Sequence, residues 1–403
     1  MSTLNLKNVS EKNSTKCRYR ICTLFSYIDD FHMTKDPGMI PYFLSKFGKY
    51  DVTIPVWSNR DYPTWKAYFP NAEFPVIEWT DSEKNRRRKM VRWIYRNAKR
   101  IDILHTYFWD RGTQLYIAAY KRANPRGIVY VHLDSNGKYL LISAGPRNPL
   151  KKLVMKSVLS EKCLDDVLFG LQNRENTEKL SGKWPFHNLI YVPNGFTWPE
   201  DLPYTPFAAR NNVILTVARN GTPPKKTDIL MNGFANVAQE FPEWKLILAG
   251  TVEEDFKPFI NSYYVKHPEL KDRVCFIGPI SDRGELQRLY ASSKIFALPS
   301  AWEGFGLVTV EAMSQGCYVV ESDIPANKDI TCNGQYGSLH KCLDEKDFTS
   351  KLREALCNPK KMASVSEAAY YYVNENYKWE KVLRPVSEWI QNKLEEKERN
   401  ILQ

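Results

Sequence analysis

Short apolar runs alternate with amphipathic stretches along the first half of the chain. The runs are four to eight residues long and rich in aliphatic and β-branched residues, which is typical of strands buried in a parallel sheet. We predict strands at 21–28, 52–56, 101–105, 127–133 and 189–192. The stretches between them repeat their apolar positions with a helical period, as at 39–47 and 86–98. This alternation predicts βαβ units.

The alternation restarts after a segment dense in proline. Pro199, Pro203 and Pro206 lie close together, and this density is incompatible with a helix or a central strand. Beyond it we predict strands at 213–218, 244–249, 274–277, 295–298 and 317–320, and helices at 227–239, 283–291 and 309–314. A helical pattern rich in Glu and Lys follows from about residue 380 to 394.

The two series of elements predict an α/β protein with two Rossmann-like, doubly wound domains that face each other across a cleft. The expected parts are a flexible polar tail at 1–17, a first domain at 18–198, a proline-rich linker at 199–207, a second domain at 208–378, and a C-terminal helix at 379–403 that crosses back to the first domain. Ligands of such sheets bind at the carboxyl ends of the strands, so we expect the functional residues there.

Composition excludes several classes of protein. Hydrophobic residues make up 43% of the 403 residues, which is too many for a disordered chain. No apolar run approaches the roughly 18–20 residues of a membrane-spanning helix, and the polar, basic N-terminus does not resemble a signal peptide. The eight cysteines form no Cys-x-x-Cys pair, so we expect neither a disulfide scaffold nor a zinc site, and a reducing cytosol fits.

Positive charge is concentrated in the first half of the chain. Residues 1–200 contain 32 Lys and Arg and 19 Asp and Glu, a net charge of +13, whereas residues 201–403 have a net charge of −2. This asymmetry predicts an anionic partner for the first domain. We find no nucleic-acid-binding motif and no stacking platform of aromatic residues, which argues against a nucleic acid.

Two basic stretches, 84–100 and 149–158, have the pattern of amphipathic helices. One interpretation is docking on an anionic membrane, to which each basic residue near the surface contributes about 1 kcal/mol. The other is an ordinary surface helix whose apolar stripe packs on the sheet. We favour the second interpretation for 84–100 and leave both open for 149–158.

Residues 302–311 (WEGFGLVTVE) carry the strongest local signal for a binding site. A predicted strand leads into this loop, and a helix begins near Leu307. Gly304 and Gly306 allow backbone N–H groups to approach an anion, and the helix N-terminus adds partial positive charge. Glu303 in the loop and Glu311 on the helix can then hold different parts of one extended ligand. The alternative is that both are ordinary solvated glutamates.

Glu303 and Glu311 resemble the E-x7-E motif of retaining glycosyltransferases with the GT-B fold, most closely family 4. The resemblance implies that Glu303 lies at the donor sugar and that Glu311 binds the ribose hydroxyls of the nucleotide. The donor-binding residues that it implies also include Gly304, Phe305, Gly306 and Leu307.

Further segments resemble the same family in the same order. Arg219 and Lys225 follow a predicted strand, as do the Arg and Lys that neutralise the donor diphosphate in the family. The family's common Lys-Gly is Lys225-Lys226 here, so Lys226 is an alternative cation, and an ordinary pair of solvated lysines is a third interpretation. Gly278 and Ile280 belong to a segment that resembles the one meeting the nucleotide base.

The first domain resembles the family less. Two predicted strands end in histidine, His105 and His132. We expect a structural role for His105, whereas the family places a His at the position of His132 beside the donor sugar. Asp134 and Asn136 follow and could meet the acceptor. The family's usual Gly-Gly pair after the first strand is absent, and Gly38 is the candidate to take its part.

The resemblance implies a retaining, metal-independent hexosyltransferase with Glu303, His132, Arg219 and Lys225 as catalytic residues. It would move a sugar from a nucleotide sugar, with UDP favoured over GDP, to a hydroxyl of a glycan, lipid-linked or protein-linked acceptor. No cofactor is expected. We expect a cytoplasmic enzyme, with the inner face of the cell membrane as a candidate contact. The alternatives are a nucleotide-sugar 2-epimerase or a phosphorylase of the same fold, or a non-catalytic basic module that binds membranes.

Overall fold

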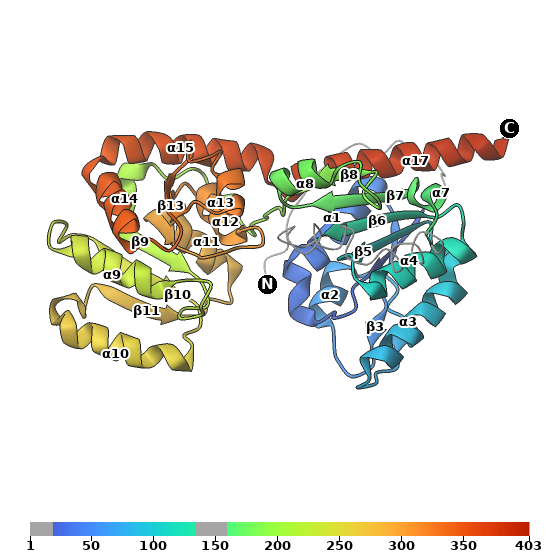
Figure 1. The fold of residues 1–403 in the computed structure, drawn as a ribbon, viewed down its shortest axis with the longest axis horizontal. Coiled ribbons are helices and arrows are strands. Elements are labelled where there is room, and N and C mark those ends of the chain that lie inside the picture. Colours follow the sequence, from blue (N-terminus) through green and yellow to red (C-terminus); the bar gives the residue numbers. More distant parts are fainter. Residues whose placement is uncertain (1–18, 134–158, 403) are drawn as a thin grey trace. The chain divides into compact units, whose positions relative to one another are not determined.

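The computed structural model describes residues 19–133 and 159–402. The chain divides into two compact units, one of residues 1–194 with 379–403 and one of residues 195–378 (Figure 1). The predicted linker at 199–207 lies inside the second unit. Within the described ranges, no helix is long and apolar enough to cross a membrane.

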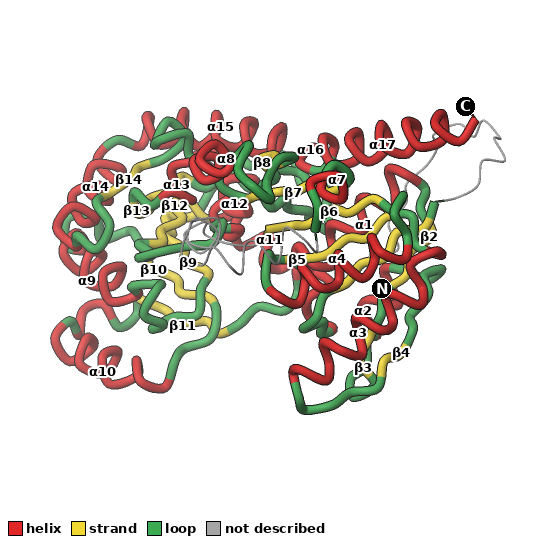
Figure 2. Tube along the Cα trace, turned by 45° about the vertical axis from the view of Figure 1, so that its right-hand side comes forward, coloured by secondary structure: helices red, strands yellow, loops and turns green. Residues whose placement is uncertain are grey.

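The first unit is built on a parallel six-stranded sheet in the order β2-β1-β5-β6-β7-β8. Helices surround the strands, which Figure 2 shows in yellow, and β5 and β6 are buried at every position. The strands are β1 (Arg20–Leu24), β2 (Asp51–Thr53), β5 (Ile103–Tyr107), β6 (Ile128–Leu133), β7 (Val167–Leu171) and β8 (Leu189–Tyr191).

The strand predicted at 52–56 is wrong as a single element. Pro55 has no N–H to donate to a ladder, and the run divides there into β2 and β3 (Val56–Trp57). β3 pairs with β4 (Val76–Ile77) in a separate parallel ribbon.

The helices of the first unit come from both ends of the chain. They are α1 (Asp36–Gly48), α2 (Pro63–Tyr68), α3 (Glu83–Asn97), α4 (Arg111–Ala123), α7 (Glu161–Leu164), α8 (Arg174–Leu180), α16 (Trp379–Val382) and α17 (Arg384–Leu402), with short 3-10 turns at Asp30–Thr34 and Ala98–Arg100. On α17, Val386, Ile390 and Leu394 are spaced four residues apart and are buried in the core of this unit. Hydrophobic burial therefore holds the C-terminal helix on the first unit.

The second unit has a parallel sheet in the order β11-β10-β9-β12-β13-β14. Counted along this unit the order is 3-2-1-4-5-6, that of dinucleotide-binding Rossmann folds. The strands are β9 (Asn211–Val217), β10 (Lys245–Ala249), β11 (Val274–Gly278), β12 (Ser293–Leu298), β13 (Tyr318–Ser322) and β14 (Ser338–His340). Two parallel, helix-covered sheets confirm the predicted α/β class.

Each face of the second sheet has its own hydrophobic core. Ile214 and Ile295 pack in one core, and Leu215 and Phe296 pack in the other, because successive strand residues point to opposite faces. The covering helices are α9 (Thr227–Ala238), α10 (Lys257–Lys266), α11 (Arg283–Ser292), α12 (Leu307–Ser314), α13 (Pro325–Ile330), α14 (Glu345–Cys357) and α15 (Pro359–Asn376), and 3-10 turns lie at Phe207–Ala209, Glu254–Phe256 and Pro268–Leu270.

The two ends of the second unit lie side by side. The Phe196 N–H donates to the carbonyl of Tyr377 at 2.9 Å, and Phe196 forms a parallel bridge with Lys378. The segment that enters this unit and the segment that leaves it are thus joined by backbone pairing.

Candidate functional site

Two loops of the second unit meet at the point where its strand order reverses. β9 and β12 are neighbours in the sheet, and their carboxyl ends lead into loops 218–226 and 299–306. The Ala301 N–H donates to the carbonyl of Pro224 at 2.7 Å, which fixes one loop against the other. A switch point of this kind is where doubly wound sheets bind their ligands.

An ion pair joins these loops through the predicted residues Lys225 and Glu303. The ammonium Nζ of Lys225 lies 2.6 Å from Oε1 of Glu303, and Ser300 Oγ donates to the same oxygen at 2.6 Å. The side chains retain only 20% and 12% of their exposure, so solvent screens the pair less than it would a surface pair. The spacing of 78 residues in sequence gave no sign of this contact.

The other predicted cations lie on the same loop. Arg219 is exposed and has no charged partner among the described residues. Lys226 precedes the first residue of α9 and has φ +49°, in the left-handed region that favours glycine. The resemblance implies a glycine at this position, and the left-handed backbone of Lys226 fits that residue.

In the glycine-containing loop before α12, the backbone at Gly304 faces open space, whereas the side chain of Phe305 is buried. A Cβ at Gly304 would meet nothing within 4 Å, whereas Gly306 has φ +88° and turns the chain into the helix. The ring of Phe305 is buried in the core, so only its backbone can reach a ligand. Leu307 is half-buried at the start of the helix.

Glu311 is buried on α12 and is held by a residue that the sequence did not suggest. Arg283, at the start of α11, places Nη2 at 2.8 Å from Oε1 of Glu311, and its guanidinium lies 4.3 Å from the ring centre of Trp198. Burial raises the pKa of Glu311, and the charge of Arg283 opposes that rise. No periodicity or motif links positions 283 and 311, so only the tertiary structure reveals this pair.

A carboxyl group that the sequence analysis did not single out lies at the end of β13. Glu321 is fully buried, and Thr309 Oγ1 donates to its Oε1 at 2.6 Å, whereas Oε2 has no partner among the described residues. Burial raises the pKa of Glu321 to about 8, and the nearby Glu303 carboxylate adds to the rise. Glu321 is therefore mostly protonated at neutral pH.

The remaining predicted donor residues lie at the end of β11. Gly278 has φ +76° and open space where a Cβ would stand. Its carbonyl accepts from the Gly250 N–H at 2.8 Å, at the end of the neighbouring strand β10. Ile280 is half-buried and packs on the core beneath α11 and α12.

In the first unit, His132 ends β6 and is fully buried. Its Nδ1 lies 3.0 Å from the Tyr130 hydroxyl, and its Nε2 lies 3.1 Å from Nε2 of Gln172, which also donates to Oδ1 of Asn194. Burial lowers the pKa of His132 to about 4, so the ring is neutral at physiological pH. Its neighbour His105 is likewise buried, with a pKa well below its usual range for the same reason.

Of the predicted acceptor residues, only Gly38 lies in the described part of the chain. A Cβ there would stand 2.2 Å from the carbonyl oxygen of Met33, so close packing of α1 on the preceding turn requires glycine. Asp134, Asn136 and the basic stretch 149–158 lie outside the described residues. The described ranges hold no group of three or more His, Cys, Asp or Glu that could bind a metal ion.

Comparisons with known proteins identify similar sequences and a similar fold. Residues 200–371 match the profile of the family described as glycosyl transferases group 1. A lipopolysaccharide core biosynthesis mannosyltransferase, LpcC of Rhizobium leguminosarum bv. viciae, is 26% identical over 159 residues, which are 39% of this chain and 44% of that protein. A phosphatidyl-myo-inositol mannosyltransferase of Mycobacterium tuberculosis is 25% identical over 167 residues, covering 40% of this chain and 43% of the relative.

The matched region thus spans less than half the length of these curated relatives. The crystal structure of Anabaena HepE in complex with UDP superposes with a TM-score of 0.66 at 17% identity, covering 93% of this chain and all of that one, which shows a shared fold. The unit that carries Glu303 and Glu311 thus matches the glycosyl transferases group 1 profile, and the chain has the GT-B fold over nearly its whole length.

Proposed function

We propose that this protein is a retaining glycosyltransferase that moves a sugar from a nucleoside-diphosphate sugar to a hydroxyl group of a glycan or lipid-linked acceptor. The Lys225–Glu303 ion pair at the switch point carries the proposal, because it places a cation and a carboxylate together at the start of α12. A nucleotide sugar carries both a diphosphate, which needs cations, and sugar hydroxyls, which carboxylates bind.

The departing nucleoside diphosphate gains negative charge as its bond to the sugar breaks. Arg219 and Lys225, with Lys226 as the alternative cation, would stabilise that charge, and the N-terminus of α12 adds partial positive charge. Glu311 would accept hydrogen bonds from the ribose, and Glu303 from the sugar. Arg283 lies 2.8 Å from Glu311, and its charge opposes the rise in the Glu311 pKa that burial causes.

The proposed transfer forms a bond between the acceptor oxygen and the anomeric carbon and breaks the bond from that carbon to phosphate. The acceptor proton passes to the departing phosphate. His132 is neutral, and both ring nitrogens have polar neighbours within 3.1 Å, so we propose that it positions the sugar and does not act as the base.

The relatives' names support an acceptor that belongs to a lipid-linked glycan. LpcC is named for the lipopolysaccharide core, and the mycobacterial relative for phosphatidyl-myo-inositol. We propose a cytoplasmic enzyme that works at the inner face of the cell membrane. UDP is the favoured nucleotide, because HepE was solved with UDP, while both named relatives are mannosyltransferases, so the sugar must be tested.

The test is release of nucleotide from UDP-, GDP-, ADP- and dTDP-sugars without acceptor, comparing the wild type with Glu303→Ala. Glu243→Ala, an exposed glutamate outside the site, is the matched control. We expect slow release from one donor, lost only in Glu303→Ala. Release from none, with no thermal shift by any nucleoside diphosphate, would overturn the proposal. Recovery of the donor as its 2-epimer would instead assign an epimerase.

A further inference from the structure

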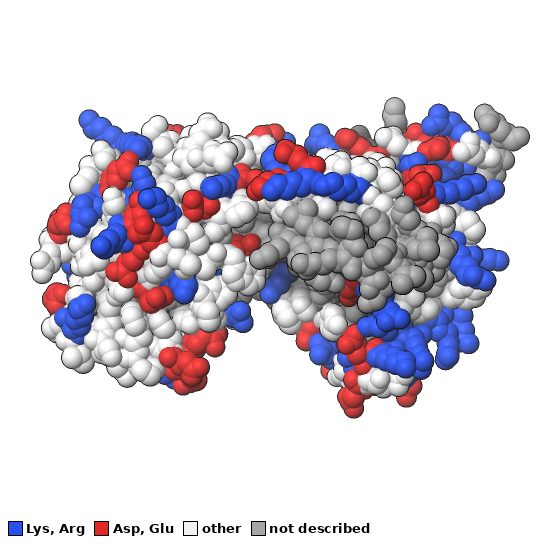
Figure 3. Space-filling view, viewed as in Figure 1, with Lys and Arg blue, Asp and Glu red and all other residues white. Residues whose placement is uncertain are grey.

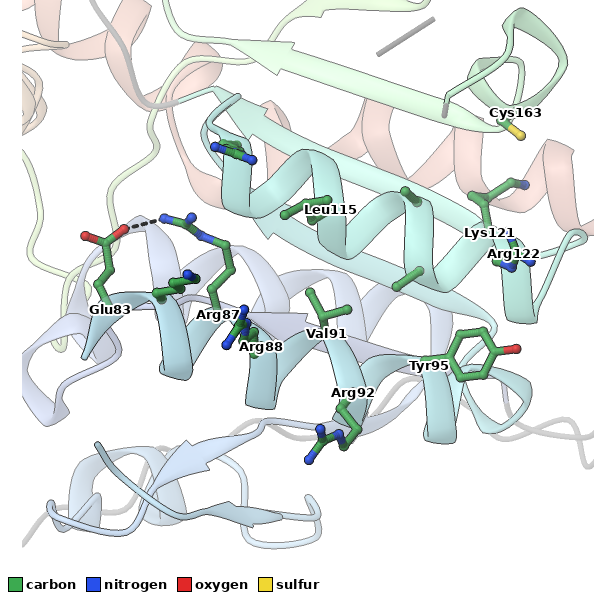
Figure 4. A pocket seen from close by; sticks show the side chains of 14 residues that line it. Glu83, Arg87, Arg88, Val91, Arg92, Tyr95, Leu115, Lys121, Arg122 and Cys163 are labelled. Carbon is green, nitrogen blue, oxygen red and sulfur yellow. Dashed lines mark hydrogen bonds and ion pairs between the residues drawn. The ribbon is translucent and has the colours of Figure 1, made fainter. Parts of the chain in front are cut away.

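A long groove runs between α3, which contains much of the basic stretch 84–100, and α4 on the first unit (Figure 4). Its volume is about 1400 Å³. Pockets for drug-sized ligands have about 300–1,000 Å³, so this groove suits a larger or extended ligand. It follows α3 from Glu83 to Tyr95, a length of about 18 Å at the helical rise of 1.5 Å per residue.

Among the described residues that line the groove, seven are Lys or Arg and one is acidic. Glu83 pairs with Arg87, and the ammonium of Lys121 is held 2.8 Å from Asp166. Five cations have no acidic partner among the described residues: Lys84, Arg88, Arg92, Arg111 and Arg122. Figure 3 shows Lys and Arg gathered in blue over this part of the molecule.

This arrangement of like charges is unfavourable unless an anion is present. Arg88 and Arg92 are four residues apart on α3, a spacing at which like charges repel each other. Four of the five unpaired side chains are arginine, whose planar guanidinium binds phosphate, sulfate or carboxylate with two hydrogen bonds. Residues 134–158, which follow β6 in the sequence, carry five Lys and Arg and one Asp, so they add net positive charge to the first half of the chain.

The shape of the groove favours an extended chain over a flat membrane. Val91 and Leu115 line it beside the arginines (Figure 4), while Met90 and Ile94 of α3 are buried in the core. Insertion into a bilayer requires large apolar side chains that project beside the charges. In this groove Tyr95 is the single large apolar residue that is exposed, among the described residues.

One end of the groove reaches the carboxyl edge of the first sheet. Arg111, which begins α4, follows β5 at that edge, and Arg87 also lines a small hollow with Ser26 and Trp57, in or next to the loops that follow β1 and β2. A ligand lying in the groove therefore leads to the edge where α/β sheets bind their substrates.

From these observations we propose that the α3–α4 groove binds an extended anionic glycan, whose phosphate, sulfate or carboxylate groups meet the unpaired arginines and whose end reaches the carboxyl edge of the first sheet as the acceptor. The assignment of this glycan as acceptor rests on the proposed transferase function. The groove gives the first unit its own means of selecting a charged acceptor.

The experiment measures binding of a heparin-derived octasaccharide to the full chain by calorimetry at low and physiological salt. The variant is Arg88→Gln with Arg92→Gln, both exposed and outside the core. The matched control removes the same charge from the second unit, by Lys266→Gln with Lys271→Gln, which are also exposed. Neutral maltooctaose and phosphatidylglycerol vesicles are measured in parallel, and the melting temperature verifies that each variant folds.

We expect octasaccharide affinity to fall at least tenfold in the arginine variant only, to weaken with salt, and to be absent for maltooctaose. Equal affinity in wild type and arginine variant would overturn the proposal. So would arginine-dependent binding of vesicles without octasaccharide binding, which would make the groove a membrane surface. If octasaccharide binding depends on the arginines but the wild type releases nucleotide from no donor, the glycan site stands and the transferase proposal fails.

Discussion

The two units have similar parallel sheets, yet the carboxyl edges of these sheets differ in their electrostatics. In the second unit, Lys225 and Arg283 hold two carboxylates, Glu303 and Glu311, in partly buried ion pairs. In the first unit, the corresponding edge carries neutral His132 among hydroxyl and amide groups. The comparison shows that the loops, and not the sheet, decide where each unit places its charged groups.

The largest effect is expected from removing a cation of the second unit. Lys225→Ala removes charge stabilisation of the leaving diphosphate and leaves Glu303 without its ammonium partner. Loss of one such electrostatic group lowers kcat by about 10²–10³-fold. Steady-state kinetics with the donor found in the panel measure this, and Lys271→Ala is the control. A loss under threefold would show that Lys225 does not act on the diphosphate.

The next largest effect is expected on the free energy of unfolding, when the neutral hydrogen-bonding network around His132 in the first unit is disrupted. His132→Ala leaves a cavity and removes the ring that faces Tyr130 and Gln172, which we expect to lower the free energy of unfolding by about 3 kcal/mol. Urea denaturation measures it, with exposed His187→Ala as control. A change below 0.5 kcal/mol, estimated as for surface substitutions, would contradict the structure.

The lowered pKa of His132 also predicts that its contribution to stability depends on pH. Its folded-state pKa of about 4 lies below its ordinary value of 6.5, so the unfolded chain takes up the proton first as pH falls. The stability that His132 contributes is present above pH 6.5 and is lost as pH falls toward 4. The difference in stability between wild type and His132→Ala should therefore shrink across this range.

A smaller effect of opposite sign is expected at Glu321. Its pKa of about 8 in the folded protein exceeds its ordinary value of 4.5, so the folded state binds this proton more tightly than the unfolded chain does. The stability gained from this protonation is fully present below pH 4.5 and is lost as pH rises to 8. Glu321→Gln removes this loss, and should raise the free energy of unfolding by about 1–3 kcal/mol at pH 8 and little at pH 5. Thermal unfolding at both pH values, with Glu243→Gln as control, tests it. Equal effects at both pH values would show that Glu321 does not titrate in this window.

The smallest effect concerns the backbone at Lys226. Its φ of +49° is unfavourable for any residue with a Cβ, so Lys226→Gly should raise the free energy of unfolding by up to about 1 kcal/mol. The same variant distinguishes the two lysines: if Lys225 is the working cation, affinity for nucleoside diphosphate changes little in Lys226→Gly. A tenfold loss of that affinity would assign the role to Lys226.

Sequence patterns predicted those parts of the structure that depend on neighbours along the chain. Both parallel sheets followed from strands separated by helices, and the loop before α12 followed from Gly304 and Gly306. Pro55 was the overlooked local signal, because it divides a run of apolar residues that otherwise fits a single strand.

Contacts between distant segments could not be predicted in this way. The pairs of Arg283 with Glu311 and of Lys225 with Glu303 depend on how loops from different strands converge, and no spacing rule encodes that. Burial of Glu321 is similar, since a carboxylate in a strand is expected to face solvent. Burial of the Phe305 side chain in the core of the second unit also depends on tertiary packing, which its place in the loop did not indicate.

The backbone pairing between Phe196 and Tyr377 makes the second unit a cassette, meaning a continuous segment with adjacent ends that can be exchanged as one piece. It is one uninterrupted stretch of chain whose two ends are adjacent, while the first unit is made of two separate stretches. Adjacent termini are what domain insertion and exchange require. A related sequence spliced between residues 194 and 379 would replace at once every donor-binding residue proposed in the second unit, and would leave His132 and the α3–α4 groove unchanged. Recombination of such cassettes is a direct route to pairing one acceptor with a new sugar.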